Sequence, residues 1–430
     1  MIDKLKTILK SNIFKHAGTY TFFNVFDRAI PFLLLPIITR HISPSEYGNY
    51  AMFQAILPIA VPFISLNCGE GVVRNFFSLK NKRDFSIYFS NSLLILLVAT
   101  ISSILIVYCF NNFFEKVINF PSEWILITLA IGFFQTFSRL NLSLYQIAKK
   151  PKNYGIYKII LTFLKFSLMI LFLVYFNKNW QGLIIAQLIS IIIVSTYSLY
   201  YFKKNGFFIF KINKNYLKDN FKIGFPLIFH KIGGWLNSFA GRIIINSLLG
   251  TAATGNYSIG ATFGIIIALL QDSFNLAFTP ILFEKLSNVI NIKEKKRIVR
   301  FTYMYHIGII TLAIIVGLIG ANLVKFIFGP EFIGAKKFVL LTCVAFAFNG
   351  SYKMHVNYIF FQKKTHITAT ITVISGLVNV LLTYVLIKTN GEIGVAQALV
   401  ISNALSFILA WYLANKVYPM PWFSANINRS

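Results

Sequence analysis

The sequence contains few cysteines and lacks the motifs of soluble catalytic sites. Its three cysteines, Cys68, Cys109 and Cys343, are scattered and form no CxxC pair, so no disulfide framework is expected. The histidines form no HExxH pair and no cluster with cysteine, which leaves no predicted metal site and no predicted cofactor. Neither a GxxxxGKS or GxxxxGKT loop nor GxGxxG occurs, so the chain itself should neither hydrolyse ATP nor bind a dinucleotide.

Acidic residues are also scarce, with 13 Asp+Glu against 41 Lys+Arg and a net charge of +28. A basic balance often indicates nucleic-acid binding. Here the basic residues lie mostly in short links between long apolar runs, which is the pattern of membrane topology, so no nucleic-acid partner is expected. Only 13% of residues are charged, 56% are hydrophobic and the mean hydropathy is +0.67, which places the chain in the membrane class.

The apolar runs predict an all-α polytopic membrane protein with about twelve transmembrane helices. No cleavage site follows the first run, so it is not interpreted as a signal peptide. The predicted spans cover residues 17–39, 46–69, 86–110, 122–146, 154–176, 180–202, 223–248, 254–280, 302–326, 333–361, 365–388 and 392–416.

Lysine and arginine alternate between successive links, which predicts the orientation of the chain. They are concentrated in the amino-terminal segment, in the even-numbered links and in the tail. The odd-numbered links hold only Arg40, Lys116, Lys178, Lys325, Lys336, Lys337 and Lys388. By the positive-inside rule both termini should be cytoplasmic. The links leave no room for an extramembrane catalytic domain, so the chain is predicted to be a transporter and not an enzyme.

The two halves of the sequence resemble each other in an ordered way. Gly48-Asn49-Tyr50 matches Gly255-Asn256-Tyr257, and Lys149-Lys150 matches Lys363-Lys364. We therefore predict two lobes of six helices each, residues 1–205 and residues 206–430. An even number of spans per half inserts both halves the same way up, an arrangement with which transporters rock around a site near the midplane.

Basic residues within the predicted spans are the candidate substrate contacts. A central charge costs about 2.5–3.5 kcal/mol in membrane insertion, so most of these residues should face a wet cavity. Such a cavity suits an anionic substrate, with phosphate or pyrophosphate the natural match for Arg. The predicted substrate-binding residues are Arg28, Arg139, Lys165, Lys231, Arg242 and Lys353. Arg139 and Lys353 occupy equivalent places on spans 4 and 10, which suggests one shared cavity.

Alternatives stay open for several charges. Lys158 is expected to snorkel to the interface, and Arg242 has the same alternative on the other side. Only Asp27 and Asp272 are expected to oppose these cations. Asp27 is the predicted ion-coupling residue, for a proton or sodium, with a counter-ion role as its alternative. Asp272 either has a functional role or only pairs with a neighbouring lysine.

Prolines are predicted to break the helical ladder in the first two spans. They stand at Pro31 and Pro36 in the first span and at Pro58 and Pro62 in the second. In membranes such breaks are tolerated where helices bend during gating or line a cavity, and the alternative is an ordinary static kink.

Several segments resemble polysaccharide flippases of the MOP exporter superfamily (O-antigen, Wzx-type). Leu35–Gly48 is similar to the end of their first span and the start of the second, and Gly224-Phe225-Pro226 to the opening of their second half. Leu249-Gly250, Phe328–Phe332 and Gly391–Ala396 also fit, in the family's order. One departure stands in span 7, where the family often has Asp-Arg and this chain has Gly241-Arg242.

The resemblance implies two six-helix lobes around a cationic cavity. It implies flipping of an undecaprenyl-pyrophosphate-linked oligosaccharide, such as an O-antigen or capsular repeat unit, to the periplasmic leaflet of the bacterial inner membrane. It further implies coupling to a proton or sodium gradient, contact with membrane lipids and a functional link to polysaccharide polymerase machinery. Three rival functions stay open. One is a multidrug or cation antiporter of the same superfamily, which should have an acidic cavity, and another is a membrane polysaccharide polymerase. The third is a lipid II flippase, whose family usually has fourteen spans.

Overall fold

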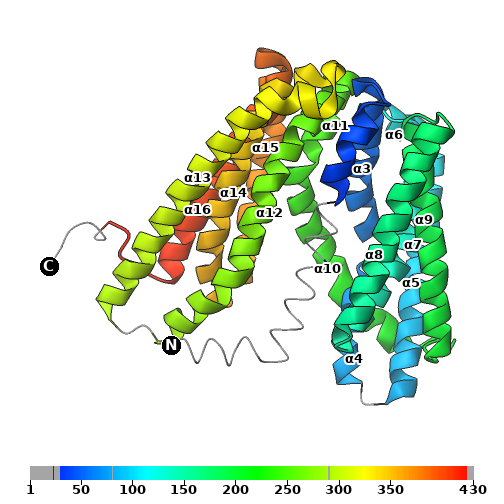
Figure 1. Ribbon diagram of the computed structural model, residues 1–430. Coiled ribbons are helices and arrows are strands. Elements are labelled where there is room, and N and C mark those ends of the chain that lie inside the picture. Colours follow the sequence, from blue (N-terminus) through cyan, green and yellow to red (C-terminus); the bar gives the residue numbers. More distant parts are fainter. Residues whose placement is uncertain (1–22, 24–29, 80, 289–290, 424–430) are drawn as a thin grey trace. The chain divides into compact units, whose positions relative to one another are not determined.

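The computed structural model describes residue 23 and residues 30–79, 81–288 and 291–423 (Figure 1). These residues are almost entirely helical and include no strand, which confirms the all-α prediction. The chain divides into two compact units, Met1–Lys231 and Ile232–Ser430. The lobe boundary predicted between residues 205 and 206 falls in the segment before helix α10 and stays a prediction.

The described part of the first unit begins with a short helix, Ile30–Thr39. Its longer elements follow in chain order and end with the start of α10, Lys214–Ser238, which continues into the second unit. They are α3 (Pro44–Ser65), α4 (Cys68–Ser78), α5 (Lys82–Cys109), α6 (Asn111–Ile118), α7 (Ser122–Ile147), α8 (Pro151–Ile170) with a π turn at Leu171–Tyr175, and α9 (Trp180–Lys204).

The second unit continues from α10 with helices joined by short turns. Its elements are α11 (Ala240–Leu249), α12 (Thr251–Asn288), α13 (Ile292–Phe328), the 3₁₀ turn η2 (Pro330–Ala335), α14 (Lys336–Phe361), α15 (Thr365–Asn390), η3 (Gly391–Ile393) and α16 (Gly394–Val417). Each predicted span from 46–69 onward therefore coincides with a helix or a pair of helices. The first predicted span, 17–39, is described only at Phe23 and from Ile30.

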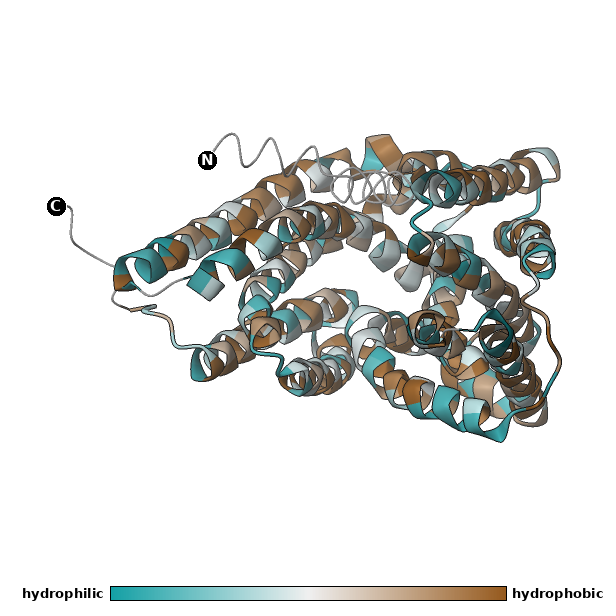
Figure 2. Ribbon diagram, turned by 90° about the horizontal axis from the view of Figure 1, so that it is seen from below, coloured by the Kyte–Doolittle hydropathy of each residue, from teal (hydrophilic) through white to brown (hydrophobic). Residues whose placement is uncertain are grey.

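Eight helical stretches of the described chain are long and apolar enough to cross a membrane. One of them, Thr365–Val417, combines α15 and α16 and spans 53 residues, enough for two crossings of a hydrocarbon core of about 30 Å. Apolar residues dominate the bodies of the helices, and hydrophilic residues are more frequent near their ends (Figure 2). The chain is thus a multi-pass membrane protein.

Helix α3 starts with a strong capping signal. The Ser43 hydroxyl accepts from the Glu46 backbone N–H, the Glu46 carboxylate accepts from the Ser43 N–H, and Pro44 occupies the first turn. This capping box satisfies donors that the helix would otherwise leave free. The motif lies within Leu35–Gly48, one of the segments that resemble the flippase family.

The prolines of the first two predicted spans do not end a helix, and their predicted role in bending or gating stays a prediction. Helix α3 continues through Pro58 and Pro62 and ends only at Ser65. The chain breaks instead at Leu66 and Asn67, which adopt left-handed φ angles of 43° and 50°. Pro31 and Pro36 likewise lie within the helix Ile30–Thr39. Neighbouring helices can satisfy the carbonyl that a proline leaves free, so a membrane helix can continue past a proline.

A second interruption divides predicted span 7. Helix α10 ends at Ser238 and α11 begins at Ala240, with Phe239 between them in a non-helical conformation. Because both interruptions lie within membrane spans, each exposes backbone groups that side chains or water must satisfy.

Candidate functional site

The break between α3 and α4 is held by helix α10. The Asn67 side-chain amide donates to the Gly224 carbonyl at 3.1 Å, and its oxygen accepts from the Lys231 ammonium at 2.6 Å. Gly224 and Lys231 are seven residues apart, so they share one face of α10. A Cβ at Gly224 would overlap the Leu66 carbonyl oxygen, so only glycine permits this close approach.

A polar cavity of about 270 Å³ opens beside this break, inside the first unit. Its lining includes Asn67 and Glu70 from the break and α4, Arg139 from α7, Tyr154 from α8 and Lys231 from α10. Each residue comes from a different part of the lobe, so the tertiary fold assembles the site. The cavity therefore unites two of the predicted substrate-binding residues, Arg139 and Lys231.

The charge in this cavity is unbalanced. Arg139 is exposed into it, and no ion pair of Arg139 occurs among the residues that the structure describes. Lys231 is half-buried, and its ammonium feels attraction from Glu70 and repulsion from Arg139. Two cations face one carboxylate in the described lining. An anion that enters the cavity would therefore meet the guanidinium group of Arg139 and the half-buried ammonium of Lys231, both of which can donate hydrogen bonds to it.

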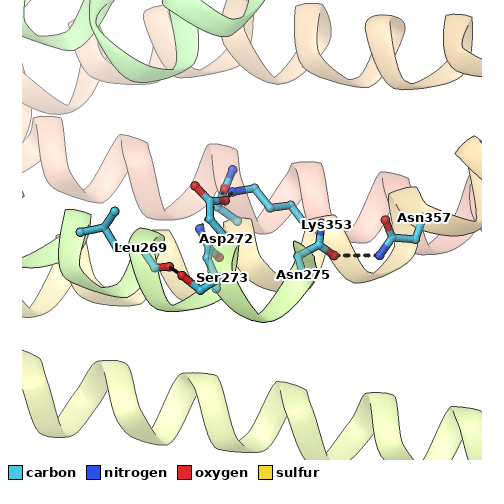
Figure 3. A network of polar contacts seen from close by, with 8 residues as sticks. Leu269, Asp272, Ser273, Asn275, Lys353 and Asn357 are labelled. Carbon is cyan, nitrogen blue, oxygen red and sulfur yellow. Dashed lines mark hydrogen bonds and ion pairs between the residues drawn. The ribbon is translucent and has the colours of Figure 1, made fainter. Parts of the chain in front are cut away.

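The equivalent position in the second unit has a different partner. Lys353 on α14 forms an ion pair of 2.5 Å with Asp272 on α12, and both side chains are about a third exposed or less (Figure 3). Asp272 thus pairs with a lysine, which was one of the two roles predicted for it. The prediction that Arg139 and Lys353 line one shared cavity concerns both units and stays a prediction.

The ion pair belongs to a row of polar contacts between α12 and α14. One turn along, the Asn357 amide donates to the Asn275 oxygen at 2.8 Å, as Figure 3 shows. One turn in the other direction, the Gln271 amide donates to Asn349 at 3.3 Å. The three partners on α14 are each four residues apart, whereas those on α12 lie at 271, 272 and 275, so the row joins one face of α14 to α12 along two helical turns. No sequence signal indicated it, because asparagine and glutamine carry no charge.

The remaining predicted cations lie elsewhere. Lys165 on α8 stands 4.4 Å above the Phe166 ring and does not line the Arg139 cavity. Arg242 on α11 lies 5.1 Å from the Phe239 ring, beside the interruption of span 7. Cation–π contacts of this kind stabilise a desolvated charge. Asp27 and Arg28 lie outside the described residues, so their predicted roles stay predictions.

The departure at Gly241 has a packing reason in this structure. A Cβ at this position would lie 3.1 Å from a methyl group of Val395, so any larger side chain would require a shift.

Sequence reasoning missed two residues of the first cavity. Glu70 was counted outside the spans because it follows the predicted end of the second span, so the expectation that only Asp27 and Asp272 oppose the cations is wrong. Asn67 carries no charge and was not singled out. The signal available was the Asn67–Gly71 stretch, whose small and polar residues interrupt the apolar run.

Comparison with known proteins then gives the context of this site. Residues 13–285 match the family described as "Polysaccharide biosynthesis protein". Among curated proteins, the chain is 24% identical over 418 residues to "Lsg locus putative protein 1" of Haemophilus influenzae, covering 92% of this chain and 98% of that protein. It is also 24% identical over 410 residues to "Capsular polysaccharide biosynthesis protein CapF" of Staphylococcus aureus, covering 92% and 97%.

Solved structures of transporters share the fold. The lipid II flippase MurJ in an inward closed conformation superposes with a TM-score of 0.68 at 14% identity, over 94% of this chain and 87% of that chain. An inward-facing multidrug resistance transporter of the MATE family, from the MOP superfamily, superposes with a TM-score of 0.66 at 15% identity, over 94% and 96%. At these identities the likeness shows that the chain shares the fold of these transporters, with which the predicted all-α, two-lobe architecture agrees, and says nothing about the substrate.

Proposed function

Because this chain belongs to the polysaccharide biosynthesis protein family, whose fold is that of membrane transporters and flippases and not of enzymes, we propose that it flips an undecaprenyl-pyrophosphate-linked oligosaccharide. The oligosaccharide would be an O-antigen or capsular repeat unit, moved across the bacterial inner membrane by alternating access. The names of the relatives, from a capsular and an Lsg locus, support polysaccharide as the cargo.

The observation that carries this proposal is the cationic cavity of the first unit. A bilayer-spanning lobe keeps Arg139 exposed and without an ion pair among the described residues, although each central charge costs about 2.5–3.5 kcal/mol to insert. A substrate phosphate explains why the charge is kept, since an arginine fork binds phosphate oxygens in a bidentate manner. Lys231, held by Asn67, adds a second donor to the lining of the same cavity.

The same cavity argues against a cation antiporter. A site for cationic drugs needs an excess of carboxylates, whereas the described lining has one, Glu70, against two basic residues. A membrane polymerase would need catalytic groups in a long loop, and the described connections between helices are short.

The orientation and energy source belong to the proposal as well. The distribution of lysine and arginine supports both termini in the cytoplasm, where the lipid-linked substrate is assembled. Asp27 is proposed to bind the coupling ion, a proton or sodium. Membrane lipids and polysaccharide polymerase machinery are the proposed partners.

Proteoliposomes carrying a defined lipid-linked oligosaccharide test this function. The purified protein should move the oligosaccharide between leaflets when a gradient is imposed, and Arg139→Ala should abolish most of this movement. Lys158→Ala is the matched control, because Lys158 is a cation on α8 that does not line the cavity. Equal flipping by wild type and Arg139→Ala, or none by the wild type with any lipid-linked oligosaccharide, would refute the proposal.

A further inference from the structure

Two apolar grooves flank helix α5 in the first unit. One, of about 440 Å³, lies between α5, α7, α9 and the segment that joins α9 to α10. The other, of about 630 Å³, lies between α3, α5 and the start of α10. Leu94 lines both, so the grooves run side by side around α5. They are separate from the Arg139 cavity and share no lining residue with it.

Each groove has one lysine in its lining, at the same level of α5. Lys211 lines the first groove, and its carbonyl accepts from the Asn91 amide at 2.8 Å. Lys218 lines the second, and two residues later Asn220 donates to the Ser92 hydroxyl at 2.6 Å. Both lysines are therefore tied to the turn of α5 that holds residues 91 and 92. The two lysines therefore enter the linings from the same end of the paired grooves, where the segment before α10 and its first turns pack on α5.

Apart from Ser90, Asn91, Ser102 and Ser103, the rest of each groove is apolar and faces lipid. Leu97 and Val98, one on each side of α5, are 47% and 55% exposed on a helix that crosses the membrane. The second groove follows α5 from Leu94 to Ser103, which is about 13 Å at the helical rise. This length is close to the depth of one leaflet, about half of a 30 Å core.

No acidic residue of the described chain lines either groove. The nearest carboxylate in sequence, Asp219, is engaged elsewhere, since it accepts from Asn75 and from the Tyr88 hydroxyl at 3.0 Å each. Two lysines at one end of the two apolar grooves match an amphiphile that has one anionic head group and two apolar chains. A single isoprenoid chain would leave one groove and one lysine without a partner.

We propose that an anionic two-chain phospholipid binds astride α5, with its phosphate between Lys211 and Lys218 and one acyl chain in each groove. The site goes beyond the proposed flipping function, because it lies outside the cavity and would hold a lipid that is not transported. The bound lipid would anchor the segment that joins α9 to α10. Side chains of α5 already bind the backbone of this segment, namely Ser86, Ser90 and Asn91.

Native mass spectrometry of the full chain in detergent tests this site with three probes: phosphatidylglycerol, phosphatidylethanolamine and undecaprenyl phosphate. The wild type should retain phosphatidylglycerol in preference to both others. The double variant Lys211→Gln with Lys218→Gln should bind phosphatidylglycerol about thirtyfold more weakly, as expected for two lysines near a lipid phosphate. Lys214→Gln is the matched control, an exposed lysine of the same segment that lines neither groove, and should change nothing.

A second variant tests the grooves themselves. Leu94→Trp places a large side chain where both grooves meet and should reduce phosphatidylglycerol retention with both lysines intact. Melting temperature in lipid-free detergent reports whether each variant is folded. Equal retention of the two phospholipids, or equal loss in Lys214→Gln and the double variant, would overturn the proposal. Preferential retention of undecaprenyl phosphate would overturn it too and assign the grooves to the substrate chain.

Discussion

At the scale of single residues, the two equivalent cations of the repeat have different electrostatic surroundings. Arg139 faces a cavity with an excess of positive charge, whereas Lys353 is neutralised by Asp272. The two halves thus carry a cation at corresponding places but surround it differently. The first arrangement is suited to bind an anion and the second to hold two helices together.

The first prediction separates charge from geometry at Arg139. Arg139→Lys should keep part of the transport, because the charge remains while the bidentate fork is lost, and Arg139→Ala should lose most of it. Surface polysaccharide, normalised to membrane-inserted protein, measures both variants. Normal output from Arg139→Ala, alone or combined with Arg28→Ala, would contradict a phosphate-binding role.

The second prediction concerns Asp272 and Lys353. Removing either partner alone should destabilise the second unit, by about 1–3 kcal/mol because the pair is only partly buried. Asp272→Asn combined with Lys353→Gln should recover much of that loss, since no unpaired charge is left. A double-mutant cycle of thermal unfolding in detergent gives the coupling free energy. Additive losses would show that the two residues act independently.

At the scale of elements, the break between α3 and α4 determines where the cavity forms. Leu66 and Asn67 adopt left-handed backbone conformations that cost about 1–3 kcal/mol each for residues other than glycine. Packing against Gly224 and the bonds of Asn67 to α10 over-determine this conformation. Ending α3 there turns α4 so that Glu70 and Asn67 line the cavity with Arg139.

The third prediction tests this packing with two glycines of one helix. Gly224→Ala should destabilise the first unit by about 1–3 kcal/mol, because its methyl group would overlap the Leu66 carbonyl oxygen. Gly234→Ala, also in α10, meets nothing within 4 Å and should be neutral or stabilising by up to about 1 kcal/mol. Unfolding temperatures of the two variants decide the matter. Similar values would mean that the close approach at Gly224 is not required.

At the scale of the whole molecule, the distribution of lysine and arginine predicts the orientation of the chain in the membrane. The direction of net transport depends on the energy source to which transport is coupled. The positive-inside rule supports cytoplasmic termini, and alternating access needs a gradient or a downstream sink to give net movement. Each has its own test.

The fourth prediction is the topology. In a Cys109→Ser background, which removes the exposed native thiol and leaves the buried Cys68 and Cys343, single cysteines report sidedness. Asn81→Cys and Lys293→Cys should be labelled only from the cytoplasm, and Lys178→Cys only from outside. Labelling of position 81 or 293 from outside would overturn the orientation.

The fifth prediction concerns coupling through Asp27. Asp27→Asn should weaken gradient-driven flipping and leave substrate binding nearly intact, because the amide keeps the shape but loses the charge that holds a cation. Transport rates at several imposed proton and sodium gradients, beside equilibrium binding, measure this. Unchanged transport at every gradient would exclude Asp27 from the mechanism.

The sequence by itself determined the class of the molecule. Hydrophobic length, the alternation of lysine and arginine and the ordered repeat are properties of the chain in one dimension, and they suffice for an all-α, two-lobe membrane protein. The predicted cations in spans 4 and 7 were recognisable because a charge in an apolar run is costly. Only the tertiary structure decided which of them meet. Arg139 and Lys231 are far apart in sequence, and they face one cavity because α3 ends at Ser65, beyond both prolines, and because Gly224 lets α10 reach the break. Which lysine pairs with Asp272 was also decided by the tertiary structure, since only the packing of α12 on α14 brings Asp272 to Lys353, together with amide contacts that no hydropathy pattern reveals.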